Sequence, residues 1–113
     1  MPVETQKPEK LQFVKDLSEK GYDDILILKR ETVQKVLTEK RMELLDTVRT
    51  EEVESVRDLA EGVERDPGIV SKDLKVLYEA ELIEFEEEKG KKKPKIRHKN
   101  VFPEPIISDK DQN

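Results

Sequence analysis

The chain has 113 residues and a formal net charge of −5, with 43% charged and 4% aromatic side chains. A chain of this length fits one small domain with a core of leucine, valine and isoleucine, and it leaves little interior for a large substrate cavity. It has no cysteine and no apolar run near the roughly 20 residues of a membrane span, which excludes disulfides and thiolate sites and predicts a cytoplasmic protein with no membrane partner.

The N-terminal part begins with a tail and a first helix. Residues 1–8 hold two prolines and predict a flexible tail. Beyond it, Leu11, Val14 and Leu17 recur at helical spacing, and Gly21 is typical of a helix C-terminus. We therefore expect a helix that ends just before this glycine.

The segment that follows allows more than one interpretation. The apolar run at 25–28 fits either a short strand or the approach to a helix. Helical spacing returns at Val33, Val36 and Leu37, which fit a core stripe first and a dimer interface second. The extension 9–37 is thus expected to complete the core, to dimerise or to contact a partner.

Thr38 is a candidate N-cap for the next helix. The expected buried stripe of this helix consists of Met42, Leu45 and Val48, with Leu44 alongside. Whether it continues the preceding helix with a bend or starts anew stays open at this point.

A short helix with a strong start signal comes next. In the run SVRD, Ser55 and Asp58 fit a capping box, in which each side chain accepts a backbone N–H at the helix start. The apolar residues expected to be buried are Val56, Leu59, Ala60 and Val63. Asp66 as N-cap and Pro67 at the first helical position then predict a second start only a few residues later.

The second helix of this pair is expected at about 66–81. Its buried stripe is Val70, Leu74 and Leu77, at positions i, i+4 and i+7. After it the period changes to alternation, which predicts a β-hairpin with one thin apolar face. The run KGKKKP, residues 89–94, is interpreted as its turn.

The C-terminal segment 100–113 contains prolines at 103 and 105, which predict irregular structure and a tail. Two helices joined by a tight turn and followed by a hairpin are typical of a winged helix-turn-helix. We therefore expect a mainly α fold with a small β-hairpin, and a winged helix-turn-helix domain at 38–99.

Charge is distributed unevenly along this chain. Residues 83–99 hold seven basic and four acidic side chains, whereas 38–82 are strongly acidic. In a winged helix the second helix enters the major groove and the wing lies along the backbone or minor groove. The residues expected to contact double-stranded DNA are Ser55, Arg65, Gly68, Ser71, Lys72, Lys75, Lys91, Lys92, Lys93, Lys95 and Arg97.

Several of these residues have a second interpretation. Ser55 fits a structural cap better than a phosphate ligand, and Arg65 can reach either DNA or the carboxylate of Asp73. Cross-strand pairing of the wing lysines 89–99 with the hairpin glutamates would give a solvated hairpin without a partner. The excess of positive charge, expected at the hairpin tip, favours the DNA interpretation.

The run LTEKRMELLDTVRTEEVESVRDLAEGVERDPGIVSKDLKVLYEAELIEFEEEKGKKKPKI, from Leu37 to Ile96, resembles a family of winged helix-turn-helix DNA-binding proteins of archaea and bacteria near the MarR and ArsR regulators. One departure is Glu81, where that family usually has glycine, so a less tight exit from the helix is expected. The resemblance implies a transcription regulator, often dimeric, and some relatives resemble antitoxins.

These observations favour a homodimeric, sequence-specific DNA-binding repressor. The alternative is an antitoxin or adaptor that binds a protein partner such as a cognate toxin through residues 9–37 and the C-terminal tail. No convergent set of nucleophile, base or metal ligands accompanies the single histidine, His98, so we expect neither an enzyme nor a cofactor.

Overall fold

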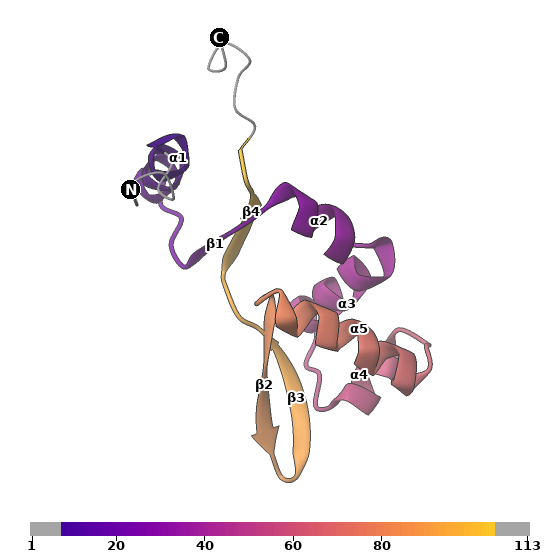
Figure 1. Cartoon of the computed structure of the whole chain (residues 1–113). Coiled ribbons are helices and arrows are strands. Elements are labelled where there is room, and N and C mark those ends of the chain that lie inside the picture. The colour runs from indigo at the N-terminus through magenta and orange to yellow at the C-terminus, as the bar shows by residue number, and fades with distance from the viewer. Residues whose placement is uncertain (1–7, 106–113) are drawn as a thin grey trace.

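The computed structural model describes residues 8–105, whose chain order of helices and strands is shown in Figure 1. The elements are α1 (Pro8–Glu19), β1 (Ile25–Leu28), α2 (Arg30–Val36), α3 (Glu39–Thr50), α4 (Val56–Gly62), α5 (Pro67–Glu79), β2 (Ile83–Glu88), β3 (Lys91–Ile96) and β4 (Asn100–Pro103). The helices α3, α4 and α5 lie together, the hairpin β2–β3 extends from one side of them, and α1 lies beyond the β1–β4 pair on the other side (Figure 1). The expected fold class, mainly α with a small hairpin, is confirmed.

The predicted caps set the helix boundaries. The Thr38 hydroxyl accepts the N–H of Arg41 at 3.3 Å, so α2 and α3 are separate helices. The Ser55 hydroxyl accepts the N–H of Asp58 at 3.0 Å at the start of α4. The Asp58 carboxylate in turn accepts the N–H of Glu54 at 2.9 Å, one residue earlier than an ordinary capping box requires.

The start of α5 also follows its sequence signals. Asp66 is the N-cap, and its carboxylate accepts the N–H groups of Gly68 and Ile69 at 2.9 and 3.2 Å. Pro67 occupies the first helical position, where its missing N–H costs no hydrogen bond.

The core lies between α3, α4, α5 and the base of the hairpin. Val70, Leu74 and Leu77 of α5 are each at most 1% exposed, which confirms the predicted stripe. They pack with Leu59 of α4 and Ile83 of β2. Val33, Val36 and Leu37 are partly buried against the same cluster, so their first interpretation, as core, holds.

The predicted stripe of α3 was partly wrong. Leu44 is fully buried and Leu45 and Val48 pack against the core, whereas Met42 is 43% exposed. At 100° per residue the mean direction of Leu44, Leu45 and Val48 lies more than a quarter turn away from Met42. The true stripe is therefore rotated about the helix axis away from Met42 and toward Leu44.

The hairpin turn is much shorter than predicted. Only Lys89 and Gly90 form it, with φ values of 52° and 77°, the left-handed pair that a two-residue type I′ turn needs. The remaining residues of KGKKKP, 91–94, belong to β3 and pair with 85–88 of β2. The lysines therefore do not gather at a tip, because three of them lie along a strand beside glutamates.

The prolines near the C-terminus do not prevent a strand. Asn100–Pro103 form β4, which pairs in parallel with β1. The N–H of Glu104 donates to Leu28 O at 2.7 Å and that of Asn100 to Asp24 O at 3.2 Å. Alternate residues face alternate edges of a strand, so Pro103 lacks an N–H only on the side away from β1. The segment at 25–28 is thus a strand, and residues 100–103 complete its sheet instead of forming an irregular tail. The tails expected at 1–7 and 106–113 lie outside the described residues.

The exit of α5 is tighter than expected. The N–H of Leu82 donates to Leu77 O and that of Glu81 to Tyr78 O, both at 3.0 Å, which is a complete Schellman motif. Glu81 takes the left-handed position with φ 66°. The Schellman motif therefore forms without glycine, and Glu81 adopts a strained left-handed backbone in it.

We expect Glu81→Gly to stabilise the protein by about 0.5–1 kcal/mol, because glycine relieves the left-handed strain but costs more chain entropy on folding. Urea denaturation followed by circular dichroism measures this change. The same substitution at Glu79, the last residue of α5, is the matched control and should destabilise slightly, because its backbone is already right-handed and glycine only adds chain entropy that folding must remove. A destabilised Glu81→Gly variant would contradict the prediction.

Candidate nucleic-acid interface

The outward face of α5 is polar and accessible. Because Val70, Leu74 and Leu77 face the core, Ser71, Lys72 and Lys75 lie on the opposite side, and all three are exposed. Gly68 lies exposed in the first turn of the same helix, where its N–H donates to Asp66. The structure thus brings four of the predicted residues to one helix face.

A groove separates this face from the hairpin. Besides Ser71, Lys72 and Lys75 of α5, Lys92 and Arg97 line it. Three glutamates also line this groove, namely Glu79, Glu84 and Glu87. Its cations therefore exceed its carboxylates by one.

Aromatic contacts fix the distance between the helix and the hairpin. The ring centroids of Tyr78 and Phe85 lie 5.5 Å apart, and the Lys92 ammonium lies 5.3 Å from the Phe85 centroid. The aromatic pair adds to area burial, and the ammonium is attracted to the ring face. These contacts keep the exposed Lys92 next to Phe85, which itself packs against Tyr78 of α5.

Lys91 and Lys92 also meet the start of α4. They line a shallow hollow with Ser55 and Arg57. Ser55 caps α4 through its hydroxyl, which agrees with its structural interpretation, and it lies next to these cations. Arg57 was absent from the sequence-based set, although its position two residues after the cap was a signal that it lies near the start of α4.

Lys93 and Lys95 lie on the other face of the hairpin. Lys93 pairs with Glu88 at 3.8 Å and Lys95 with Glu86 at 3.6 Å. Both lysines line a hollow against the end of α3, which contains Glu51 and other residues of that turn. They are therefore separated from the groove beside α5, and the cross-strand pairing expected for a solvated hairpin is present here.

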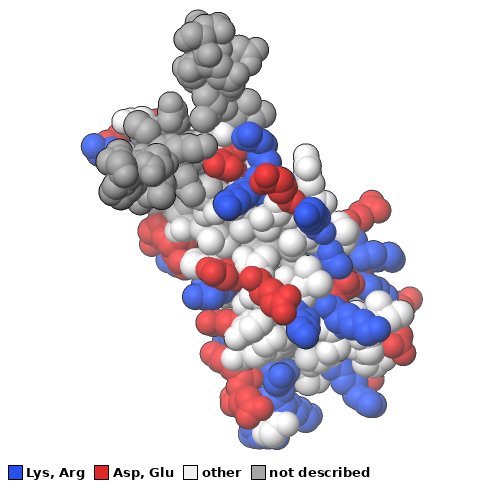
Figure 2. Space-filling model, in the orientation of Figure 1, with Lys and Arg blue, Asp and Glu red and all other residues white. Residues whose placement is uncertain are grey.

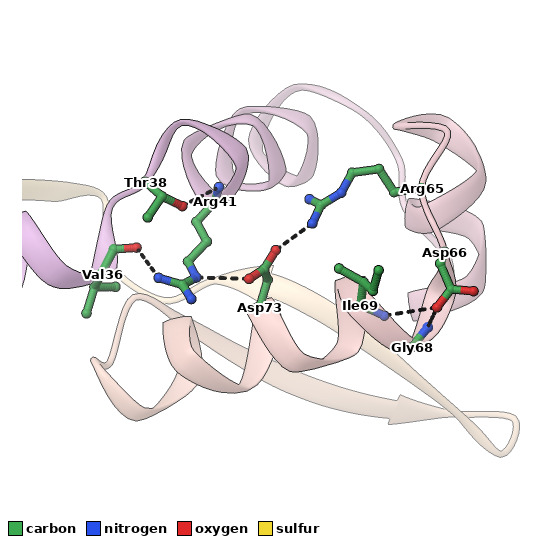
Figure 3. A network of polar contacts seen from close by, with 8 residues as sticks. All are labelled: Val36, Thr38, Arg41, Arg65, Asp66, Gly68, Ile69 and Asp73. Carbon is green, nitrogen blue, oxygen red and sulfur yellow. Dashed lines mark hydrogen bonds and ion pairs between the residues drawn. The ribbon is translucent and has the colours of Figure 1, made fainter.

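Arg65 does not reach the surface groove. Its Nη2 lies 2.7 Å from Asp73 Oδ2, and Arg41 Nε lies 3.0 Å from the other carboxylate oxygen (Figure 3). Arg41 also donates to the backbone oxygens of Lys35 and Val36 at the end of α2. Of its two interpretations, Arg65 thus fulfils the contact with Asp73, and this network joins α2, α3 and the α4–α5 turn to α5.

Two further side chains on this surface were not predicted. Ile69 is 53% exposed in the first turn of α5, and Tyr78 is 50% exposed on the same helix. The sequence did not single out Ile69, because a lone apolar residue next to Val70 gives no separate signal. An exposed apolar side chain at this position could contact a thymine methyl group.

The two signs of charge are unevenly distributed over the surface. In the face seen in Figure 2, acidic side chains run along the lower left, where β2 lies, basic side chains lie over the helices at the right, and both signs lie together at the hairpin end. Among the described residues, no helix is long and apolar enough to cross a membrane, and no three of His, Cys, Asp and Glu group as they would around a metal ion.

Three stacked helices, a capped helix pair and an attached hairpin define a winged helix-turn-helix domain. The chain belongs to the HVO_A0114 family, whose sequence model matches residues 36–102, more than half of its length. The match begins one residue before the run from Leu37 to Ile96 that carried the resemblance. It ends beyond that run, within β4.

A solved structure shares this fold. It is the solution structure of the homodimeric winged helix-turn-helix DNA-binding domain, fragment 1–100, of Mb0332 from Mycobacterium bovis, described as a possible ArsR-family transcriptional regulator. The TM-score is 0.53 at 19% identity over 81% of this chain and 73% of that one. No curated protein matches the sequence of this chain.

Proposed function

We propose that this protein binds double-stranded DNA and regulates transcription as a homodimeric repressor. The observation that carries the proposal is the groove in which exposed Ser71, Lys72 and Lys75 of α5 face Lys92 and Arg97. A duplex that accepts α5 in its major groove would bring phosphates against both walls of this groove. The likeness in fold to a homodimeric DNA-binding domain supports the same reading.

Each part of the surface then has a role. The first two turns of α5, with Gly68, Ser71 and Lys72, would meet base edges, since this end of a recognition helix enters the groove. Lys91, Lys92 and Arg97 would neutralise phosphates and supply affinity that depends on salt. One recognition helix contacts few base pairs, so a second copy is needed to read a useful operator.

The hollow that Lys91 and Lys92 share with the start of α4 gives a direct test. We expect Lys91→Ala/Lys92→Ala to weaken binding to all duplexes and to lower the slope of log K against log salt by up to about 1.8, because each lost phosphate contact removes about 0.9. Fluorescence anisotropy with the duplex from the gene's own upstream region, titrated from low to moderate salt, measures this slope.

The matched control is Lys93→Ala/Lys95→Ala, which removes the same charge from the same strand. Both lysines are paired with hairpin glutamates on the face away from α5. We expect a clearly smaller change in slope for this pair. Equal slopes for the two variants would contradict the proposed DNA-facing surface, and no binding by the unmodified protein at low salt would contradict DNA binding itself.

A second candidate is a winged helix that binds protein, as in an antitoxin or adaptor. The ion pairs of Lys93 and Lys95 favour it, because they leave a hairpin face with little free positive charge. Such a partner would contact the extension 9–37 or β4. Absence of DNA binding at low salt, together with co-purification of the product of a neighbouring gene, would favour this candidate.

A further inference from the structure

The β1 strand has one edge that no described strand covers. Among residues 8–105 its sheet contains just β1 and β4. Leu28 O accepts the N–H of Glu104 from the β4 side, so Leu28 faces β4. Alternate residues face alternate edges, and the N–H and C=O groups of Ile25 and Ile27 therefore point to the uncovered edge. Unpaired strand edges of this kind accept further strands.

The two outer edges of this sheet differ in what they can accept. The outer edge of β4 includes Pro103, which has no N–H to donate, and Pro105 follows it. The outer edge of β1 has the sequence ILIL, without proline or charge. Proline protects an edge against additional pairing. Of these two edges, the outer edge of β1 is therefore the one that can pair along its whole length.

The residues that flank β1 specify what fits there. The run DDILILKR places Asp23 and Asp24 before the strand and Lys29 and Arg30 after it. Such a strand is acidic at one end and basic at the other. Two copies in antiparallel orientation bring opposite charges together at both ends, whereas parallel copies bring like charges together. A second copy of the same chain is therefore the complementary partner.

The charges also favour one register. In an antiparallel pair, the side chains of directly opposite residues point to the same face of the sheet. In a symmetric pair of β1 strands, one residue must therefore lie opposite its own copy, on the two-fold axis. The residues nearest the middle of the strand are Leu26 and Ile27. With the axis at Leu26, Asp23 lies opposite Lys29 of the second copy. With the axis at Ile27, Asp23 lies opposite Glu31, a like charge, and Asp24 lies opposite Arg30, but both of these side chains already have partners within their own chain. The register centred on Leu26 is therefore preferred.

The inner charges of this run are already used within the chain. The Asp24 carboxylate lies 2.8 Å from His98 Nδ1 and accepts the N–H of Lys99 at 3.1 Å, and the hydrogen bond with His98 holds the pKa of Asp24 below its ordinary value of 3.8. Arg30 donates to the backbone oxygen of Pro105 at 3.0 Å. These contacts hold β1 against β4.

The outer charges are free to act between chains. The Asp23 side chain is 73% exposed, with a 3.5 Å contact to Lys99, which is also exposed. Lys29 is exposed at the N-cap of α2, where it makes no capping hydrogen bond. The register centred on Leu26 therefore pairs Asp23 and Lys29, the flanking side chains with the weakest contacts within their own chain.

We propose that two copies of this chain pair through the outer edge of β1, antiparallel about a two-fold axis at Leu26, into a continuous four-stranded sheet in the order β4–β1–β1–β4. This rests on the homodimer in the proposed function and names its surface. The β1–β4 pair lies away from the hairpin end (Figure 1), so the pairing leaves α5 and the wing accessible.

The test uses the full chain and two charge variants. In Asp23→Lys positions 23 and 29 are both basic, and in Lys29→Asp both are acidic, so each variant replaces the two attractions between these positions in the dimer by two repulsions. We expect each to dimerise about tenfold more weakly in sedimentation velocity at low salt. A 1:1 mixture restores both attractions, and we expect heterodimers to form about as well as the unmodified homodimer.

A second pair of variants tests the backbone edge itself. Ile27→Pro removes an outward N–H from β1, whereas Val101→Pro removes an outward N–H from β4, and neither donor belongs to the β1–β4 ladder. We expect the first to be monomeric and the second to remain dimeric, both with unchanged helical circular dichroism. The Val101→Pro variant thus controls for proline strain in this small sheet.

The outcomes separate this proposal from DNA binding. An unmodified chain that stays monomeric at about 100 µM, or a mixture with no preference for heterodimers, overturns the β1 pairing. A dimer that survives Ile27→Pro overturns it as well. None of these substitutions lies on α5 or the hairpin, so a duplex carrying one half-site should bind the two proline variants, which keep their charge, as well as it binds the unmodified protein. Failure of this duplex to bind even the unmodified protein contradicts the DNA proposal alone.

Discussion

Asp73→Ala is expected to lower the free energy of unfolding by about 2–4 kcal/mol, because it leaves two arginines without their carboxylate. Arg41 and Arg65 hold the two oxygens of Asp73 at 3.0 and 2.7 Å, and the three side chains are 15–20% exposed. The range lies slightly below that of a fully buried pair, since water reaches part of the site. Urea denaturation followed by circular dichroism measures the change.

The chain offers a matched control for this substitution. Asp46 pairs with Arg49 at 3.1 Å, but both side chains are about 65% exposed. Asp46→Ala should therefore change stability by at most about 0.5 kcal/mol. If the two aspartate variants lost equal stability, the Asp73 network would have no more influence than a surface ion pair, and its role in joining α3 to α5 would be wrong.

The network also explains why one predicted contact could not be assigned from sequence. Arg65 lies just before α5, where an arginine can reach either a ligand or the carboxylate eight residues later. Only the packing of α3 against α5 brings Arg41 to the same carboxylate and draws Asp73 inward. The spacing of the two residues allows the contact but cannot show that a third residue completes it.

Local signals, in contrast, determined most helix boundaries. Thr38, Ser55 and Asp66 cap helices through contacts with residues two or three positions away, and such contacts depend little on the rest of the fold. The stripe of α5 was predictable because its apolar residues have one clear period. The stripe of α3 was not, since Met42 and Leu44 offer competing faces and only the packing partner decides between them.

The hairpin and the small sheet depended on pairing between distant residues. Sequence alternation predicted the strands, but KGKKKP contains so many lysines that a long turn looked as suitable as a two-residue turn. Pairing of 91–94 with the glutamate strand decided for the short turn. Similarly, β4 forms despite Pro103 because β1, some 75 positions earlier, accepts hydrogen bonds only from the edge of β4 opposite the proline nitrogen.

This arrangement determines which basic residues are expected to matter most for binding. Lys72 and Lys75 lie exposed on α5 and have no ion-pair partner among the described residues. We expect Lys72→Gln/Lys75→Gln to weaken binding to the cognate duplex by about 10–100-fold, since each contact to a base edge or phosphate contributes roughly 1 kcal/mol or more. Folding should be unaffected, because neither side chain packs in the core.

The control must carry the same loss of charge elsewhere. Lys15 and Lys20 are exposed at and just after α1, which lies away from α5 (Figure 1). Lys15→Gln/Lys20→Gln should weaken binding by a small, uniform factor through the general field alone. Equal losses for the two double variants would mean that net charge, rather than the face of α5, determines affinity.

A third variant separates recognition from attraction. Ser71→Ala removes one hydroxyl from the same face without changing charge, so it should leave the salt slope unchanged while altering which duplex is preferred. Competition with duplexes that differ at single base pairs measures this preference. If Ser71→Ala and the lysine variants all changed affinity equally for every duplex, α5 would contact only the phosphate backbone, and sequence-specific regulation through this helix would be contradicted.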